Sequence, residues 1–253
     1  MIDTITFDLW NTLIYNTPLD TFRYKEMRLV GILGAFKSEG VTLNYNELEK
    51  AYDQSFLECE KFWVKDINLD TNEQLRILLS LVPQLHLKDF GQNLMDKISQ
   101  AYTDPIIYDP PDLVENAREI LQYLKEKEYK IGLICNTGRT PGKTIRKLME
   151  NLFILKYLDV LTFSNELKIR KPKPEIFVHT LKELKSSPSN SIHIGDVLNL
   201  DVLGAKNAGM KAIHLNKNNC DYSDIRPDFS IKELRELKGI LGRMDPFWKS
   251  QGI

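Results

Sequence analysis

The second half of the chain alternates short apolar runs with amphipathic helical patterns, and this alternation is the strongest constraint on its fold. Strands are predicted at residues 129–135, 159–163, 191–195 and 211–214. Helices are predicted at residues 112–127, 141–150, 174–184 and 200–208, with a last helix beginning near Ile231. Strands that alternate with helices form a parallel sheet covered on both faces. We therefore predict an α/β fold built on a parallel sheet.

A further strand is predicted at residues 4–8, separated from the others by a long helical segment. Between about residues 16 and 102 the apolar residues recur at helical spacing. The first of four predicted helices carries Leu19, Phe22, Met27, Val30 and Leu33. The second begins near Asn44 with Glu47 in a capping box, and the others cover residues 71–81 and 88–100. We expect a core of residues 1–15 and 103–253, with an inserted helical domain at residues 16–102.

Polar residues follow three of the predicted strands at the point where each strand ends. Asp8 follows the first strand, Cys135 and Asn136 end the second, and Asp196 follows the strand at 191–195. The carboxyl ends of parallel strands share one edge of the sheet, where ligands bind in such folds. The sequence therefore predicts that these residues line one cleft.

The residue types at this edge indicate hydrolytic chemistry. The carboxylate of Asp8 can attack phosphorus or carbon and form an ester that water then cleaves. Asp196 and Asp201 open a helix after a buried strand, and carboxylates with waters and substrate phosphate are the usual ligands of Mg²⁺. Lys171, in a loop rigidified by prolines, supplies a second positive charge that would neutralise the nucleophile and the transferred group.

Composition narrows the kind of partner. The net charge is −1, which gives no electrostatic case for nucleic acid or an anionic membrane. No apolar run approaches the ~20 residues that a membrane span requires. The three cysteines show neither a disulfide framework nor zinc spacing, and the first residues lack the regions of a signal peptide. We expect a cytoplasmic enzyme, a monomer or homodimer, that acts on a small molecule.

The order of these residues resembles the four motifs of the haloacid dehalogenase superfamily, whose members are mostly phosphatases. The family pattern Asp-x-Asp-x-Thr falls at Asp8 and Thr12, and its later Ser or Thr falls at Cys135. The motif lysine falls at Lys171, and the final acidic pair falls at Asp196 and Asp201.

The resemblance implies a Rossmann-like parallel sheet core with an inserted helical cap domain that closes over the substrate. It implies catalytic roles for Asp8, Thr12 and Lys171. It also implies Mg²⁺ held by Asp8, the backbone carbonyl of Trp10, Asp196 and Asp201. The expected reaction is hydrolysis of a small phosphorylated metabolite through an aspartyl-phosphate intermediate.

Two positions depart from the family pattern. Trp10 replaces the second aspartate, the general acid of family phosphatases, and an indole has only an N–H donor. Cys135 replaces a hydroxyl residue, and its thiol is a weak donor. The phosphate is therefore expected on the backbone N–H groups of Asn136 and Thr137, with Arg139 as a further candidate for a substrate anion.

Other functions remain open. The superfamily's 2-haloacid dehalogenases have tyrosine at the position of Trp10, and halide leaves without a proton. They are metal-free, however, and Asp196 beside Asp8 without a cation would raise one of the two pKa values. A non-catalytic scaffold that binds a phosphorylated ligand or a protein is the second alternative. The cap charges Arg23, Arg28 and Lys65 are interpreted only as charged residues on helices, and core or surface roles are expected for His86, His179, His193 and His214.

Overall fold

The computed structural model of the protein describes residues 1–65, 67–85, 90–217 and 224–244. The chain forms two compact units. The first, which we call the sheet unit, comprises Met1–Tyr15, Asp112–Asn136 and Leu152–Ile253. The second, the helical unit, comprises Asn16–Pro111 and Thr137–Asn151, so it contains the segment expected as a cap together with a later helix.

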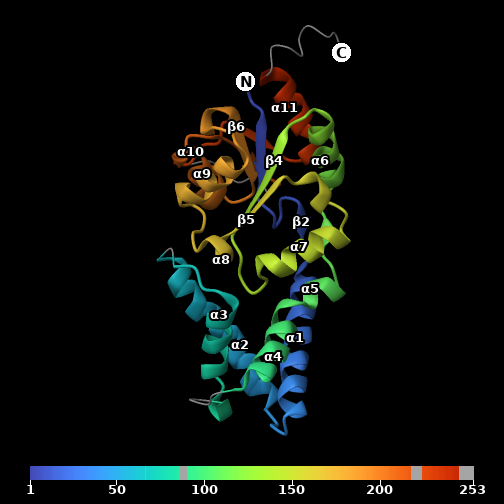
Figure 1. Ribbon diagram of the computed structural model, residues 1–253, viewed down its shortest axis with the longest axis vertical. Coiled ribbons are helices and arrows are strands. Elements are labelled where there is room, and N and C mark those ends of the chain that lie inside the picture. The colour runs from blue at the N-terminus through green and yellow to red at the C-terminus, as the bar shows by residue number, and fades with distance from the viewer. Residues whose placement is uncertain (66, 86–89, 218–223, 245–253) are drawn as a thin grey trace. The chain divides into compact units, whose positions relative to one another are not determined.

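The sheet unit is built on six parallel strands in the order β5-β4-β1-β6-β7-β8, as Figure 1 shows in part. The strands are β1 (Thr4–Phe7), β4 (Lys130–Cys135), β5 (Val160–Phe163), β6 (Ser191–Gly195), β7 (Lys211–Leu215) and β8 (Phe229–Ile231). Strand β1 lies between β4 and β6, with Ile5 beside Ile131 and Ile192. The residues that follow these three strands therefore emerge at one edge, as the sequence predicted.

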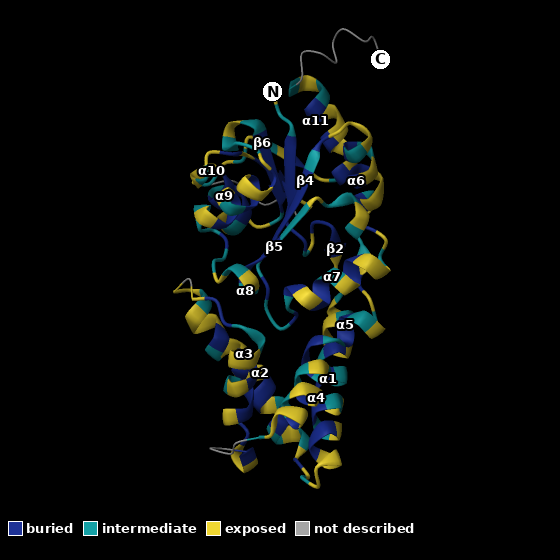
Figure 2. Ribbon diagram, viewed as in Figure 1, coloured by how far each residue is buried: buried dark blue, intermediate teal, exposed yellow. Residues whose placement is uncertain are grey.

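Helices cover both faces of this sheet. Helices α9 and α10 lie on one side, and α6 and α11 lie on the other (Figure 1). The helices of the unit are α6 (Ala117–Glu126), α8 (Ser164–Leu167), α9 (Pro174–Glu183), α10 (Leu203–Asn207) and α11 (Leu237–Met244). Phe177 and Leu181 of α9 pack with Ile134 and Ala212 of the sheet. The inner strands are buried along nearly their whole length (Figure 2). Their buried polar side chains are hydrogen-bonded, as Thr6 of β1 is to His193 of β6.

Two predicted helix starts in the sheet unit are wrong, and a third helix forms as predicted but with an irregular first turn. Asp112–Leu113 form strand β3, antiparallel to β2 (Ile14–Tyr15), so the helix expected from 112 begins at Ala117. Phe229–Ile231 pair with β7, so the last helix starts at Leu237. The helix expected at 200–208 opens as a π-helix, Leu198–Val202, before α10. In the first two cases a short segment gains ladder hydrogen bonds from a neighbouring strand, which local periodicity cannot reveal.

The helical unit contains α1 (Pro18–Ser38), α2 (Tyr45–Trp63), α3 (Thr71–Ser80), α4 (Gln92–Thr103), α5 (Pro105–Tyr108) and α7 (Gly142–Asn151). Short 3₁₀ turns occur in the two units at Pro83–Leu85, Leu155–Tyr157, Pro188–Asn190 and Leu234–Glu236. Asn44 caps α2 through its side chain, but Glu47 returns no hydrogen bond, so the predicted capping box is only half formed. No helix among the described residues is both long and apolar enough to cross a membrane.

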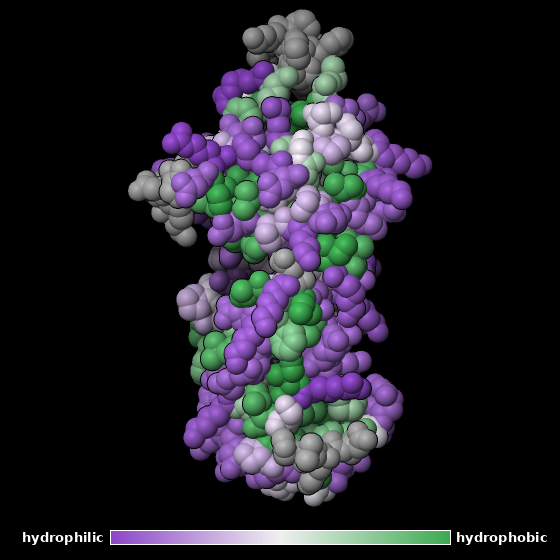
Figure 3. Space-filling view, turned by 90° about the vertical axis from the view of Figure 1, so that its left-hand side faces the viewer, coloured by the Kyte–Doolittle hydropathy of each residue, from purple (hydrophilic) through white to green (hydrophobic). Residues whose placement is uncertain are grey.

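Helix α1 buries a different face from the one its spacing suggested. Leu29, Ile32 and Phe36 are fully buried in the core of the helical unit. Leu19 and Val30 are about three-fifths exposed, at 62% and 61%. Apolar residues therefore occur on several sides of α1. On the face of the molecule that Figure 3 shows, hydrophobic side chains likewise reach the surface among hydrophilic ones. Helical periodicity alone could not identify the buried side of this helix.

Candidate active site

Lys171 lies at the centre of the candidate site, between two carboxylates of the sheet unit. Its Nζ donates to Oδ1 of Asp8 at 2.5 Å and to Oδ1 of Asp201 at 2.6 Å. The lysine side chain is only 2% exposed. A buried ammonium is stable only when it is paired and hydrogen-bonded, and this one has two anionic partners. The structure thus brings together three residues that lie far apart in the sequence.

Asp201 is held from several directions. Its Oδ2 accepts from the backbone N–H of Val197 at 3.0 Å, and its Oδ1 lies 3.2 Å from Nε2 of His193. The other ring nitrogen of His193 lies 2.9 Å from the hydroxyl of Thr6 on β1. A Cβ on Gly195 would come within 2.2 Å of Asp201, so the carboxylate needs a glycine at this position. The result is a fixed acceptor for the ammonium of Lys171.

Asp8 is the less compensated of the two carboxylates. Burial raises the pKa of Asp8 to about 7; Lys171 opposes the shift, while the carboxylates of Asp201 and Asp196 add to it. For Asp201, burial works to raise the pKa, but Lys171 and His193 outweigh it and hold the pKa well below its usual range. Burial works to lower the pKa of Lys171, but Asp201 and Asp8 outweigh it and hold the pKa above its usual range. The contacts agree with these directions: Asp201 accepts from Lys171, His193 and the Val197 N–H, whereas among the described residues the Asp8 carboxylate accepts from Lys171 alone. A further cation would therefore stabilise ionised Asp8.

Three carboxylates converge where such a cation would bind. One oxygen each from Asp8, Asp196 and Asp201 lie within 4.8 Å of one another. Burial, and then the charge of Asp201, raise the pKa of Asp196. A hard divalent cation bound by carboxylate oxygens would remove this repulsion, so the donor set fits Mg²⁺. Asp201 already accepts three hydrogen bonds, which leaves Asp8 and Asp196 as the more available ligands.

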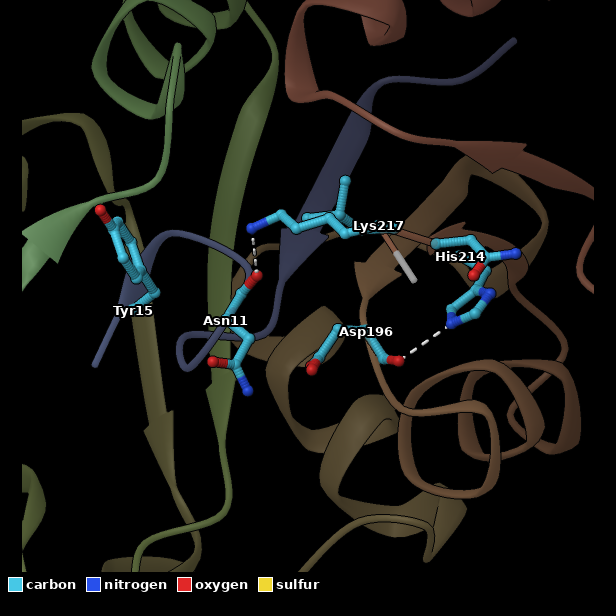
Figure 4. Close-up of a pocket in the computed structure, with 7 residues that line it drawn as sticks. Asn11, Tyr15, Asp196, His214 and Lys217 are labelled. Atoms are coloured by element: carbon cyan, nitrogen blue, oxygen red, sulfur yellow. Dashed lines mark hydrogen bonds between the residues drawn. The ribbon is translucent and has the colours of Figure 1, made fainter. Parts of the chain in front are cut away.

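A pocket of about 310 Å³ adjoins Asp196 (Figure 4). The backbone carbonyl of Asp196 accepts from Nε2 of His214 at 2.9 Å, which fixes the turn that carries the carboxylate. On the opposite side of the pocket, Lys217 donates to the backbone carbonyl of Asn11 at 3.0 Å. His214 was expected in a core or surface role, and it contacts the backbone of the candidate metal site.

The loop after β1 is folded tightly around the carbonyl of Leu9. This carbonyl accepts from the N–H groups of Thr12, Leu13 and Ile14 at 2.8–3.3 Å. Asn11 has a φ of 59°, a left-handed conformation that asparagine tolerates better than most residues. The Thr12 side chain is fully buried, and its hydroxyl has no hydrogen-bond partner among the described residues. Trp10 is only half-buried, so its indole lies near the surface of the sheet unit.

Cys135 and Asn136 end strand β4 and have different environments. The Cys135 thiol is fully buried, burial raises its pKa, and its Sγ lies 3.6 Å from the carbonyl of Asn136. The Asn136 amide donates to the carbonyl of Lys171 at 2.9 Å and accepts from the Lys171 N–H at 2.8 Å. The side chain of Asn136 therefore holds the backbone of the lysine. Sequence reasoning considered only its backbone N–H.

Thr137 and Arg139, predicted to bind substrate, belong to the helical unit. Thr137 is buried, and Arg139 is half-buried against α2. The roles of His193 and of the Asn136 side chain were missed because each depends on a partner in another strand or loop: Thr6 and Asp201 for His193, and Lys171 for Asn136. Two local features of the sequence pointed to these residues. His193 lies just before Gly195 and Asp196, and Asn136 directly follows a strand.

The parallel sheet, the carboxylate after its central strand and the paired lysine define an α/β protein of hydrolase type. The sequence profile of the haloacid dehalogenase-like hydrolases matches residues 2–209. The chain belongs to this family, which confirms the resemblance and the predicted Rossmann-like core.

Individual relatives include both phosphatases and dehalogenases. A glyceraldehyde 3-phosphate phosphatase of Methanothermobacter thermautotrophicus is 32% identical over 133 residues, 47% of this chain and 57% of the relative. The chain thus matches little more than half the length of that relative. A HAD phosphatase from Thermococcus onnurineus superposes with a TM-score of 0.65 at 22% identity, over 95% of this chain and 98% of that one. A 2-haloacid dehalogenase from Pseudomonas syringae superposes with a TM-score of 0.70 at 20% identity, over 97% and 100%. At these identities the two structures establish the fold alone.

Proposed function

We propose that the protein is a magnesium-dependent phosphatase that hydrolyses a small phosphorylated metabolite through an aspartyl-phosphate intermediate. The observation that carries this proposal is the buried ion pair of Asp8 with Lys171, placed beside the carboxylates of Asp196 and Asp201. A binding scaffold would not require a buried carboxylate whose charge is incompletely balanced. The phosphatase names of several relatives support the same substrate class.

Asp8 acts as the nucleophile in the proposed reaction. Its carboxylate oxygen forms a bond to phosphorus while the bond from phosphorus to the ester oxygen breaks, and water then cleaves the acyl phosphate. Lys171 keeps Asp8 oriented and offsets the negative charge of the transferred group. Bound Mg²⁺ would supply the remaining positive charge, with Asp8, Asp196, Asp201 and the Trp10 carbonyl as its protein ligands.

The remaining contacts to the phosphoryl group are assigned to backbone donors. The neutral, buried thiol of Cys135 is a poor donor, so we assign the phosphoryl oxygens to the N–H groups of Asn136 and Thr137. Thr12, whose buried hydroxyl has no partner among the described residues, is retained as a residue of the catalytic loop. The proposed setting is the cytoplasm, and the proposed substrate is a freely diffusing phosphate ester.

Dehalogenation is the alternative that one observation favours, because Trp10 cannot donate a carboxyl proton to a leaving oxygen. Halide needs no such proton. Asp196 argues against this reaction, since a third carboxylate without a cation would raise the pKa of Asp8 further and weaken it as a nucleophile. Chloride release from 2-chloropropionate in the presence of EDTA would support dehalogenation and contradict the proposal.

Hydrolysis of 4-nitrophenyl phosphate with Mg²⁺ or with EDTA tests the proposed function. The leaving phenolate is a weak base, so the substrate scarcely requires the missing acid. We expect turnover with Mg²⁺, none above background with EDTA, and recovery when Mg²⁺ is restored. Asp53→Asn, at a carboxylate 61% exposed on α2, is the matched control and should leave the rate unchanged. Absence of turnover in Mg²⁺ would contradict the proposal.

A further inference from the structure

Arg28 of α1 is buried inside the helical unit, and it has no acidic partner among the described residues. The residue is only 7% exposed. Its Nε donates to the carbonyl of Tyr102 at 2.8 Å, one terminal nitrogen contacts the hydroxyl of Tyr52 at 3.3 Å, and the other contacts the hydroxyl of Thr140 at 3.5 Å. All three acceptors are neutral. A guanidinium has five N–H donors, so Arg28 retains donors beyond these contacts.

The guanidinium of Arg139 contacts Tyr52, the same tyrosine that Arg28 contacts. Its terminal nitrogen donates to the carbonyl of Tyr52 at 3.1 Å, and its guanidinium carbon lies 4.0 Å from the centre of the Tyr52 ring. The ring of Phe56 lies 5.0 Å away on the same helix. The Nε atom of Arg139 is buried and has no hydrogen-bond partner among the described residues. Stacking thus orients this guanidinium while leaving one of its donors unused.

The two positive charges are not neutralised within the part of the chain that the structure describes. No carboxylate there lies within 4.0 Å of either guanidinium. Asp104 is close to Tyr102 in sequence, but its Oδ1 accepts from the hydroxyls of Thr103 and Thr144. Arginine cannot lose its proton in a protein, and a buried charge without a counter-ion is costly. Because both buried guanidinium groups contact Tyr52, a single anion bound beside them would offset both charges.

We propose that Arg28 and Arg139 form an oxyanion-binding site in the helical unit, with Tyr52 as the platform that orients both. The ligand carries a carboxylate or phosphate group, because the planar fork of a guanidinium matches paired oxygen atoms. The anion comes either as a second acidic group of the substrate or as a separate small molecule. From the sequence Arg28 was interpreted only as one of three charged residues on the cap helices, and its burial is what distinguishes it from Arg23 and Lys65.

Direct binding is tested first, without turnover, in the metal-free protein. Thermal unfolding is followed with added sodium phosphate or sodium malonate, against sodium chloride at equal ionic strength, because a ligand of the folded state raises Tm. We expect stabilisation of the wild type, and binding at least tenfold weaker in Arg139→Gln. Arg76→Gln, at an exposed arginine on α3, is the matched control and should bind as the wild type does.

Charge-retaining variants cover the case in which Arg139→Gln folds poorly, as judged by circular dichroism. Arg139→Lys and Arg28→Lys keep the positive charge but lose the forked donors, so both should bind malonate more weakly than the wild type. If neither anion stabilises the wild type, or if all three variants bind as tightly as it does, the site does not exist.

Steady-state kinetics identifies the source of the anion, and this arm alone rests on the proposed function. The ratio of kcat/KM for 2-phosphoglycolate, which has a carboxylate, to that for 4-nitrophenyl phosphate, which has none, is compared between variants. A ratio at least tenfold lower in Arg139→Gln, with Arg76→Gln unchanged, supports a second acidic group on the substrate. An unchanged ratio together with lost malonate binding supports a separate anionic ligand. Failure of the proposed function would abolish turnover of both esters and leave the binding result intact.

Discussion

Lys171 depends on Asn136 for its position, although the two residues are 35 positions apart. The amide of Asn136 bonds both backbone polar groups of Lys171, and this leaves the ammonium of the lysine aimed at Asp8 and Asp201. Asn136→Leu keeps the number and branching of the side-chain heavy atoms and removes both hydrogen bonds. A misplaced catalytic group can cost about 10²-fold in rate.

We therefore expect kcat of Asn136→Leu for 4-nitrophenyl phosphate to fall by about 10²-fold, with a smaller change in KM. Asn136→Asp retains the acceptor for the Lys171 N–H, so it should recover part of the lost rate. Steady-state kinetics on both variants, after a check of thermal unfolding, provides the measurement. A kcat for Asn136→Leu close to that of the wild type would show that the lysine does not need this support.

The presence of Trp10 in place of a carboxyl residue predicts how the rate depends on the leaving group. Without a carboxyl at this position the rate should depend steeply on the pKa of the departing alcohol, because a positioned general acid is typically worth ~10²–10⁴-fold. Aryl and acyl phosphates should turn over much faster than alkyl phosphates. Trp10→Asp should raise the alkyl rate selectively, provided that thermal unfolding shows the variant to be folded. Equal wild-type rates on both substrate classes would mean that another residue supplies the proton. Glu166 of α8, a carboxylate in the segment that leads to Lys171, would be the first to test.

For single residues, the sequence predicted which residues form the site but not the contacts between them. Asp8, Lys171, Asp196 and Asp201 were each recognised because they follow a strand or lie in a rigid loop, and the structure brings all four together. His193 and the side chain of Asn136 were missed, since their partners come from other strands and loops. A contact that depends on strand order becomes visible only once the order β4-β1-β6 is known.

At the scale of elements, α1 shows the limit of periodicity. Its apolar residues lie on several sides, and the buried set around Leu29 and Ile32 was not the set that the spacing indicated. The inner strands were predicted well because each is a short segment rich in Ile, Leu or Phe that lies outside the helical periodicity on either side. Strands β3 and β8 were missed because two or three residues pair only when a neighbour is present.

The two faces of α1 can be separated by stability. Ile32→Ala removes a fully buried side chain and should lower the free energy of unfolding by about 2–5 kcal/mol. Val30→Ala, on the same helix at 61% exposure, should change it by less than about 0.5 kcal/mol. Urea denaturation of both variants is the measurement, and similar losses in the two would contradict the assigned core.

At the scale of the whole molecule, metal binding and stability are linked. An ion that binds only the folded protein stabilises it by mass action, so Mg²⁺ should raise Tm. Asp196→Ala should abolish this increase and the heat of Mg²⁺ binding in calorimetry. In the metal-free state the variant should be no less stable than the wild type, because removing Asp196 relieves repulsion among the three carboxylates. Unchanged Mg²⁺ affinity in Asp196→Ala would place the metal elsewhere.

The covalent intermediate on Asp8 is the central claim of the proposed function. The protein is mixed with excess 4-nitrophenyl phosphate and Mg²⁺, quenched in acid within one turnover, digested, and analysed by mass spectrometry. The peptide that contains Asp8 should gain the mass of one phosphoryl group, sensitive to hydroxylamine and absent from Asp8→Asn, which should also lose turnover. Continued turnover by Asp8→Asn, or a phosphoryl group found on another residue, would contradict the account.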